Sequence, residues 1–218
     1  MAEKAIASGS LAVTYTNEDQ SSGVASGDLQ TQDGKSTPVK FPFDDALWGL
    51  GDSTITVTGD VATLNGTLGT KSYAQVAELL KDHPNVKTLV LGAVPGSVND
   101  DVNMHTGRLV RNAGLTTKVL DTSEIASGGV DLFAAGQRRI VEDGARIGVH
   151  SWCCVSDLTA IELPEEHPAH GAQLAYFTEI LGAERGPEFY FYTLRSAEFD
   201  DIHWMSATEI QTWGLATE

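Results

Sequence analysis

Basic residues are scarce in this chain. Its 218 residues include 14 lysines and arginines against 30 aspartates and glutamates, which gives a formal net charge of −16 at pH 7. Nucleic acids and anionic membranes are bound mainly through clusters of lysine and arginine, and the densest basic spot here is the pair Arg138-Arg139. Long apolar runs are also missing, since none approaches the roughly 18 residues of a membrane span. The sequence therefore predicts neither a nucleic-acid partner nor a membrane span.

Cysteine is almost missing as well. The two cysteines, Cys153 and Cys154, are adjacent, and a disulfide between neighbours closes a strained ring. We therefore expect no disulfide framework, and we interpret the pair as packing residues, with a redox role as the less favoured alternative.

A charged segment followed by an apolar one, as in an export signal, is not visible at the start of the sequence. Residues 1–38 are instead rich in Ser, Gly, Thr and Asp, like the tether that often follows a removed export signal. This composition favours an exported, periplasmic protein, although the same residues are compatible with a cytoplasmic one.

The rest of the composition is that of an ordinary globular protein. Hydrophobic residues make up 41% and charged residues 20% of the chain, whose 218 residues suffice for about one large domain. We expect residues 1–45 to form a polar tether or a hairpin, with strands near 10–16 and 37–43. We expect residues 46–218 to form a single α/β domain.

Within that domain, strand patterns alternate with helix patterns. Alternating or continuous apolar runs predict strands, and apolar residues at helical spacing predict helices. The expected strands lie in 53–69, 86–94, 116–123 and 138–152, and the expected helices in 72–83, 99–114, 127–136, 170–181 and 207–213. The first helix is expected to begin at a capping residue, Ser72. Such an alternation predicts parallel strand pairing with right-handed crossovers.

Reactive side chains occur where these strands end, which is where α/β sheets bind ligands. Ser127 lies at the expected N-terminus of a helix, and His150 ends a strand 23 residues later. A serine hydroxyl becomes a nucleophile when a base such as imidazole lies beside it, and the resulting oxyanion needs two N–H donors. Gly128 and the loop 95–97 could supply these donors. The plainer alternatives are a helix cap for Ser127 and a structural role for His150.

Three longer stretches carry a resemblance. "IASGGVDLFAAGQRRIVEDGARIGVHSW", "LVLGAVPGSVND" and "FDDIHWMSATEIQTWGLAT" resemble, in the same order, the nucleophile-to-histidine segment, the oxyanion loop and the closing motif of the ClpP/crotonase superfamily. The resemblance spans roughly residues 53–218 and includes bacterial exported ClpP-like proteins. It implies an α/β fold, a ClpP/crotonase-like spiral of ββα units with parallel sheets in a single domain.

The resemblance also implies roles for individual residues. Ser127 matches the nucleophile and His150 the general base. Gly128 and Gly96 match the amides of the oxyanion hole, and Ser97 replaces the second glycine of the family's loop.

The third member of the implied triad is out of register. An ungapped match of "HWMSA" places Ile202 at the position of the family's aspartate, so Asp201 is displaced by one residue and Asp200 by two. We expect Asp201, or else Asp200, to orient His150 and to stabilise its imidazolium form.

These residues predict a serine hydrolase, and a peptidase in particular, that acts on a peptide or small acyl substrate without cofactor, metal or ATP. Two alternatives stay open: crotonase-like chemistry on an acyl-CoA thioester, and a catalytically silent module for binding or assembly. Self-association into a homo-oligomer is expected from the resemblance. A metal site at His167 and His170 is the less favoured interpretation of a segment that more simply forms a solvated loop and the start of a helix.

Overall fold

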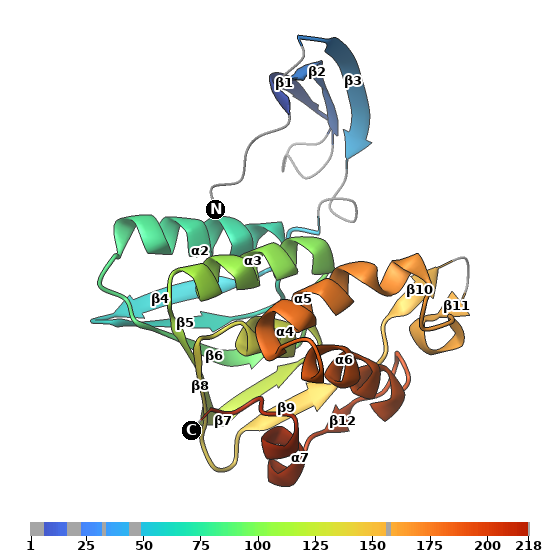
Figure 1. Ribbon diagram of the computed structural model, residues 1–218. Coiled ribbons are helices and arrows are strands. Elements are labelled where there is room, and N and C mark those ends of the chain that lie inside the picture. Colours follow the sequence, from blue (N-terminus) through green and yellow to red (C-terminus); the bar gives the residue numbers. More distant parts are fainter. Residues whose placement is uncertain (1–6, 17–22, 32–33, 44–48, 156–157, 218) are drawn as a thin grey trace. The chain divides into compact units, whose positions relative to one another are not determined.

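The computed structural model describes residues 7–16, 23–31, 34–43, 49–155 and 158–217. The chain divides into two compact units, Met1–Gly49 and Leu50–Glu218 (Figure 1). The boundary expected between residues 45 and 46 lies outside the described residues and stays a prediction.

The first unit is a three-stranded antiparallel sheet with the order β1-β2-β3, formed by Ala7–Tyr15, Gly23–Thr31 and Ser36–Phe43. The outer strands coincide with the two expected from the sequence. The central strand, β2, was not expected, because "GVASGDLQT" contains few of the β-branched and aromatic residues that mark a strand.

The second unit is built on one mixed sheet, whose strands have the order β12-β9-β7-β6-β5-β4, with β8 also paired to β7. The pairs β5–β6, β6–β7, β7–β8 and β7–β9 are parallel, whereas β4–β5 and β12–β9 are antiparallel. The strands are β4 (Thr54–Thr58), β5 (Val61–Asn65), β6 (Thr88–Val94), β7 (Thr116–Ala126), β8 (Arg138–Val141), β9 (Arg146–Val149) and β12 (His203–Trp204). The parallel core confirms the expected α/β fold.

Helices follow the parallel strands, as the alternation predicted (Figure 1). They are α2 (Thr70–Asp82), α3 (Asp100–Asn112), α4 (Gly128–Ala134), α5 (Gly171–Leu181), α6 (Arg185–Ser196) and α7 (Ala207–Thr212). A short hairpin of β10 (Cys153–Val155) and β11 (Leu158–Thr159), and the 3₁₀ turns Ala160–Glu162 and Pro168–His170, connect β9 to α5. The crossovers bring the ends of β6, β7 and β9 together at one edge of the sheet.

Two expectations about helices need correction. Ser72 does not begin α2: the helix starts after Gly69, and the Ser72 hydroxyl reaches back to accept a hydrogen bond from the Gly69 N–H at 3.0 Å. Helix α6 was not expected as a separate element, because four consecutive aromatic residues, 189–192, obscure its apolar face. Phe189, Tyr190 and Leu194 are nevertheless buried in it.

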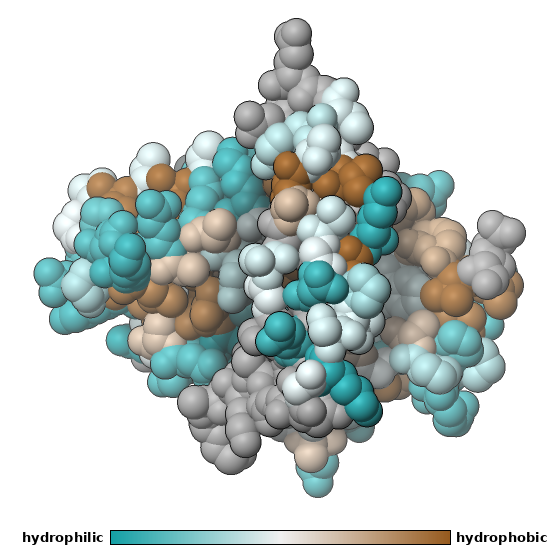
Figure 2. Space-filling model, turned by 90° about the horizontal axis from the view of Figure 1, so that it is seen from above, coloured by the Kyte–Doolittle hydropathy of each residue, from teal (hydrophilic) through white to brown (hydrophobic). Residues whose placement is uncertain are grey.

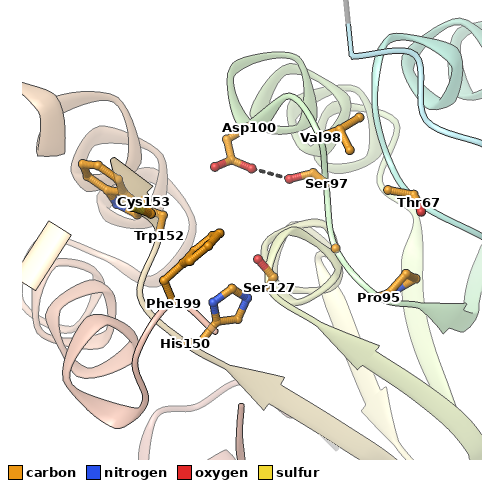
Figure 3. A pocket seen from close by; sticks show the side chains of 11 residues that line it. Thr67, Pro95, Ser97, Val98, Asp100, Ser127, His150, Trp152, Cys153 and Phe199 are labelled. Carbon is orange, nitrogen blue, oxygen red and sulfur yellow. Dashed lines mark hydrogen bonds between the residues drawn. The ribbon is translucent and has the colours of Figure 1, made fainter. Parts of the chain in front are cut away.

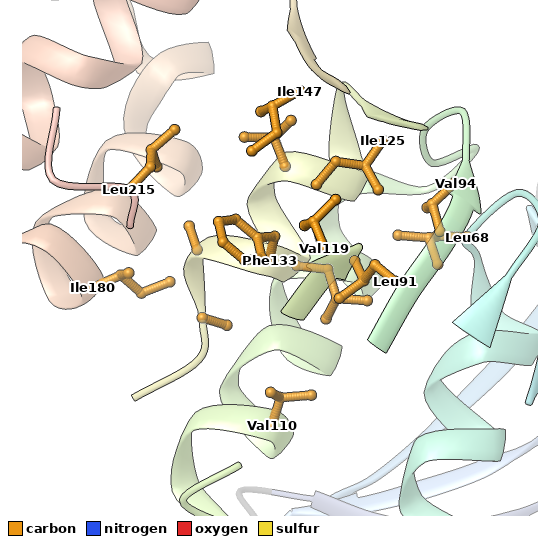
Figure 4. Packing of buried hydrophobic residues seen from close by; sticks show 14 of the residues in the cluster. Leu68, Leu91, Val94, Val110, Val119, Ile125, Phe133, Ile147, Ile180 and Leu215 are labelled. Atoms are coloured by element: carbon orange, nitrogen blue, oxygen red, sulfur yellow. The ribbon is translucent and has the colours of Figure 1, made fainter. Parts of the chain in front are cut away.

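The hydrophobic core lies between the sheet and its helices (Figure 4). Val94, Ile125 and Ile147 project from β6, β7 and β9, and Phe133 of α4 is fully buried among them. Burying a side chain of this size stabilises the fold by roughly 1.5–3 kcal/mol. The strands that end at the candidate site are therefore held rigidly by the core below it.

The surface is more polar than the core, as the acidic composition requires. On the face in Figure 2, hydrophobic side chains form separate groups between hydrophilic ones. No helix within the described ranges is long and apolar enough to cross a membrane.

Candidate active site

Ser127 lies in a strained turn between β7 and α4. Its backbone has φ 52° and ψ −127°, and it is the one residue other than glycine with a positive φ in the described parts of the chain. Such a conformation costs about 1–3 kcal/mol and persists where the surrounding structure enforces it. The Ser127 N–H donates to the Gly148 carbonyl of β9 at 3.0 Å, and the Ser127 carbonyl accepts from Val130 at 2.8 Å. These bonds hold the turn in place.

The hydroxyl of Ser127 does not serve as a helix cap. Although Ser127 occupies the N-cap position of α4, its side chain makes no capping hydrogen bond. A cap was the simplest structural explanation for a serine at this position. The side chain instead lines a cavity of about 480 Å³, where it can meet a ligand.

Gly96 and Gly128 both lie beside Ser127. A Cβ on Gly96 would lie 3.2 Å from the Ser127 Cβ, and a Cβ on Gly128 would lie 2.2 Å from the Ser97 hydroxyl. Within the described residues neither glycine N–H donates a hydrogen bond to another group. Both N–H groups are therefore free to stabilise negative charge beside Ser127.

The loop that carries Gly96 is anchored to the neighbouring strand connection. The Leu68 N–H donates to the Gly96 carbonyl at 2.9 Å, and the Val98 N–H donates to the Leu68 carbonyl at 2.9 Å. The Ser97 hydroxyl donates to the Asp100 carboxylate at the start of α3. Ser97 thus fixes the loop through its side chain while it packs against Gly128.

His150 follows β9 and lines the same cavity as Ser127. Figure 3 shows the imidazole beside the Ser127 side chain. The Nδ1 atom of His150 lies 2.7 Å from the Ser151 carbonyl. A carbonyl can only accept, so this contact assigns the proton to Nδ1 and leaves Nε2 with the lone pair that a general base needs.

The two candidate acids lie outside this arrangement. Asp200 and Asp201 are both exposed, and the Asp201 carboxylate accepts a hydrogen bond from the Ile202 N–H at 2.8 Å. No hydrogen bond joins either carboxylate to His150 among the described residues. The residue of this segment that contacts His150 is Phe199, with ring centroids 6.4 Å apart. In this structure the Ser151 carbonyl occupies the orienting position expected of an aspartate.

Two carboxylates near Ser127 were not singled out in the sequence. Asp100 and Asp131 line a second cavity, of about 30 Å³, together with Ser127, His150 and Trp152. Asp131 is partly exposed and lines this cavity, and burial followed by the charge of Asp100 raises the pKa of its carboxyl group well above the ordinary value. The spacing was the available signal, because residues 127 and 131 are one helical turn apart.

Asn103 is a further residue that the sequence did not reveal. It lies fully buried on α3, and its Nδ2 donates to the Gly128 carbonyl at 2.8 Å. Its Oδ1 is buried without a hydrogen-bond partner in the described structure. No local pattern distinguishes this asparagine from others on an amphipathic helix.

The histidines considered for a metal have other roles. His170 caps the start of α5, where a helix was expected to begin, but it is fully buried, and its Nδ1 lies 2.7 Å from the Tyr190 hydroxyl. Burial lowers its pKa. The His167 Nδ1 accepts from the Ala169 N–H at 3.2 Å. No group of three or more metal-ligating side chains occurs in the described part of the chain.

The two cysteines begin β10. The sulfur atoms of Cys153 and Cys154 lie against each other, as adjacent residues in one short strand allow. A link between neighbours crosslinks no distant segments. Cys153 also lines the larger cavity.

No family model matches the sequence, and neither does any curated protein. Among solved structures, a membrane-bound stomatin-specific protease in complex with a substrate peptide is similar at 15% identity, with 72% of each chain covered and a TM-score of 0.51. An enoyl-CoA hydratase from Bacillus anthracis is similar at 16% identity over 75% of this chain and 68% of that one, with a TM-score of 0.48. At this identity the likeness to the protease shows a shared fold alone, and that fold agrees with the α/β fold expected from the sequence motifs.

Proposed function

We propose that this protein is a serine hydrolase that cleaves a peptide or a small acyl substrate. The observation that carries the proposal is the position of Ser127 and His150, whose side chains lie next to each other and line one cavity (Figure 3). The strained turn at Ser127 supports it, because such strain is concentrated at functional sites. The unpaired N–H groups of Gly96 and Gly128 complete the constellation.

The chemistry follows from these positions. Nε2 of His150 accepts the hydroxyl proton as the Ser127 oxygen attacks the substrate carbonyl. The N–H groups of Gly96 and Gly128 stabilise the oxyanion. His150 then returns the proton to the leaving group as the acyl-enzyme forms, and a water molecule, activated in the same way, releases the acid and restores Ser127.

The orientation of His150 is provided by a backbone carbonyl. The contact from Nδ1 to the Ser151 oxygen selects the required tautomer without a negative charge. A neutral carbonyl stabilises an imidazolium less than a carboxylate does. We therefore expect a slower enzyme than one with an aspartate at this position, unless Asp201 moves to His150 when substrate binds.

The rim of the cavity supports a substrate with apolar groups. Val98 and Phe199 line it and are 53% and 52% exposed. Large apolar side chains that remain exposed beside a reactive group are typical of ligand-contacting positions. They offer contacts on either side of the scissile bond.

A second candidate is acyl-thioester chemistry that uses Asp131 in place of the Ser–His pair. The supporting observation is that Asp131 lines a cavity together with Ser127 and that burial and the charge of Asp100 raise the pKa of its carboxyl group, as is common for acid–base groups at functional sites. The charge of the site is unfavourable for this candidate. Neither cavity is lined by lysine or arginine, which the phosphates of CoA would require.

A fluorophosphonate probe tests the first candidate. Wild-type protein and a Ser36→Ala control, which alters an exposed serine of the N-terminal unit, should be labelled, whereas Ser127→Ala should not. His150→Ala should label at least about a hundredfold more slowly, the usual contribution of a general base. Equal labelling of wild type and Ser127→Ala, or a folded wild type that resists labelling, would overturn the hydrolase proposal.

We also propose that the protein self-associates, because the fold it shares implies assemblies. Light scattering should give a mass that is a multiple of the monomer mass. A monomer at micromolar concentration would contradict this proposal and would leave the hydrolase proposal intact.

A further inference from the structure

The two cavities at the candidate site meet at the reactive residues. Asp100, Ser127, His150 and Trp152 line both of them. A substrate held at Ser127 can therefore extend one group from the larger cavity into the smaller one. The side chains around the smaller cavity decide which group fits there.

The charges of this smaller cavity are unbalanced. Its lining contains two carboxyl groups, Asp100 and Asp131, and neither lysine nor arginine. The Asp131 side chain has no hydrogen-bond or ion-pair partner among the described residues. Asp100 accepts only the short hydrogen bond from Ser97. Burial and the charge of Asp100 raise the pKa of Asp131, so a cation placed between the two carboxyl groups would favour the ionised form of both.

The size of the cavity restricts that cation. A volume of about 30 Å³ holds a group of one to two water molecules, since one water needs roughly 10–15 Å³. An ammonium group is of this size, whereas a planar guanidinium is larger. Trp152 lines both cavities, and a methylene stem can pack against it.

We infer that the site selects substrates in which the side chain beside the scissile acyl group ends in a primary ammonium group. This ammonium group is held between Asp100 and Asp131. Lysine-type side chains have this chemistry, with an apolar stem that reaches from the larger cavity into the smaller one. The inference rests on the proposed hydrolase function, and it names the substrate class of the same site. Asp100 and Asp131 are specificity-determining residues in this arrangement.

The first test compares two substrates that differ only in the terminal ammonium group of one side chain. Peptide esters with lysine or with its uncharged analogue norleucine at the cleaved position should differ in kcat/KM by at least about tenfold in favour of lysine, as one charge-assisted hydrogen bond allows. Asp100→Asn and Asp131→Asn should each remove most of this preference. Asp101→Asn is the matched control, because Asp101 is exposed in the same helical turn and lines neither cavity.

The second test does not depend on hydrolysis. In the Ser127→Ala protein, n-pentylammonium should bind in a saturation-transfer NMR experiment and n-pentanol should not, and the Asp100→Asn/Asp131→Asn double variant should lose the binding. Equal turnover of the two esters, or pentylammonium binding that survives the double variant, would overturn the ammonium site while hydrolysis stands. If pentylammonium binds to the Ser127→Ala protein while the folded wild type resists fluorophosphonate, the hydrolase proposal alone is overturned.

Discussion

Asn103 donates a 2.8 Å hydrogen bond from its side-chain amide to the carbonyl of Gly128. A fully buried residue of α3 thereby holds the first residue of α4, directly after Ser127. The bond fixes the peptide plane that follows Gly128. Asn103 therefore positions the turn that presents the nucleophile, although it does not line either cavity.

Asn103→Ala should weaken both the fold and the site. It leaves the buried Gly128 carbonyl without its donor, which costs about 1–3 kcal/mol in the free energy of unfolding. The turn at Ser127 loses a constraint, so fluorophosphonate labelling should slow at temperatures where the variant is fully folded. Urea denaturation and labelling rates check the two effects. Asn112→Ala, at the exposed end of the same helix, should change neither; a similar effect at both positions would refute the positioning role.

Gly128→Ala should slow fluorophosphonate labelling strongly. The added Cβ would lie 2.2 Å from the Ser97 hydroxyl and 2.9 Å from Asn103 Nδ2, so the loop or the turn must shift. Displacing one oxyanion donor slows acyl transfer by about 10²–10³, and overpacking costs about 1–3 kcal/mol of stability.

The control for this substitution is Gly171→Ala. Gly171 begins α5, and a Cβ there meets no atom within 4 Å. Alanine is the better helix former, so this variant should gain up to about 1 kcal/mol of stability and label normally. A Gly128→Ala protein that labels as fast as Gly171→Ala would show that the contacts around Gly128 do not matter to the site.

The parts of the fold that follow from local patterns could be predicted from the sequence. The apolar runs of β6 and β9 and the small residues around Ser127 are local, and they placed Ser127 and His150 at the same edge of the sheet. Asp131 and Asn103 depend on how α3 packs against α4, which no short pattern records. The strands β10 and β12 were missed because they contain only three and two residues.

The hydrogen-bond partner of His150 could not be predicted from the sequence either. A sequence motif implied an aspartate near residue 201, whereas the structure gives Nδ1 the carbonyl of Ser151. Backbone carbonyls occur at every residue, so nothing in a sequence distinguishes the one that will accept such a bond. The orienting role of Asp201 stays a prediction.

Asp131→Asn should stabilise the protein, and increasingly so as the pH rises. The folded state raises the pKa of Asp131 well above 3.8, so between these two pKa values the folded protein holds a proton that the unfolded chain has lost. The free energy of unfolding then falls with rising pH by up to about 1.4 kcal/mol per unit. Asparagine does not titrate, so Asp131→Asn removes this fall in the free energy of unfolding.

Urea denaturation between pH 4 and pH 8 measures the difference between Asp131→Asn and wild type. The difference should be small near pH 4 and should grow until the pH passes the pKa of folded Asp131. Asp101→Asn, at an exposed carboxylate of α3, should show no comparable growth. A constant difference for Asp131→Asn across this range would mean that the folded state does not hold the proton.

Ser127→Gly should yield a more stable protein than Ser127→Ala. The backbone of Ser127 at φ 52° is strained for any residue with a Cβ, and alanine retains that strain whereas glycine relieves it. Relief of about 1–3 kcal/mol exceeds the 0.5–1 kcal/mol that glycine loses through its freer unfolded chain. Both variants lose the nucleophile, so denaturation midpoints compare stability alone.

The same two substitutions at Ser196 provide the matched control. Ser196 lies at the helical end of α6, where alanine is favoured over glycine by about 1 kcal/mol, so the order of stability should be reversed there. If glycine is the less stable variant at both positions, the turn at Ser127 stores no strain. If glycine is the more stable variant at position 127 and alanine at position 196, the fold holds Ser127 in a backbone conformation that is unfavourable for a residue with a Cβ.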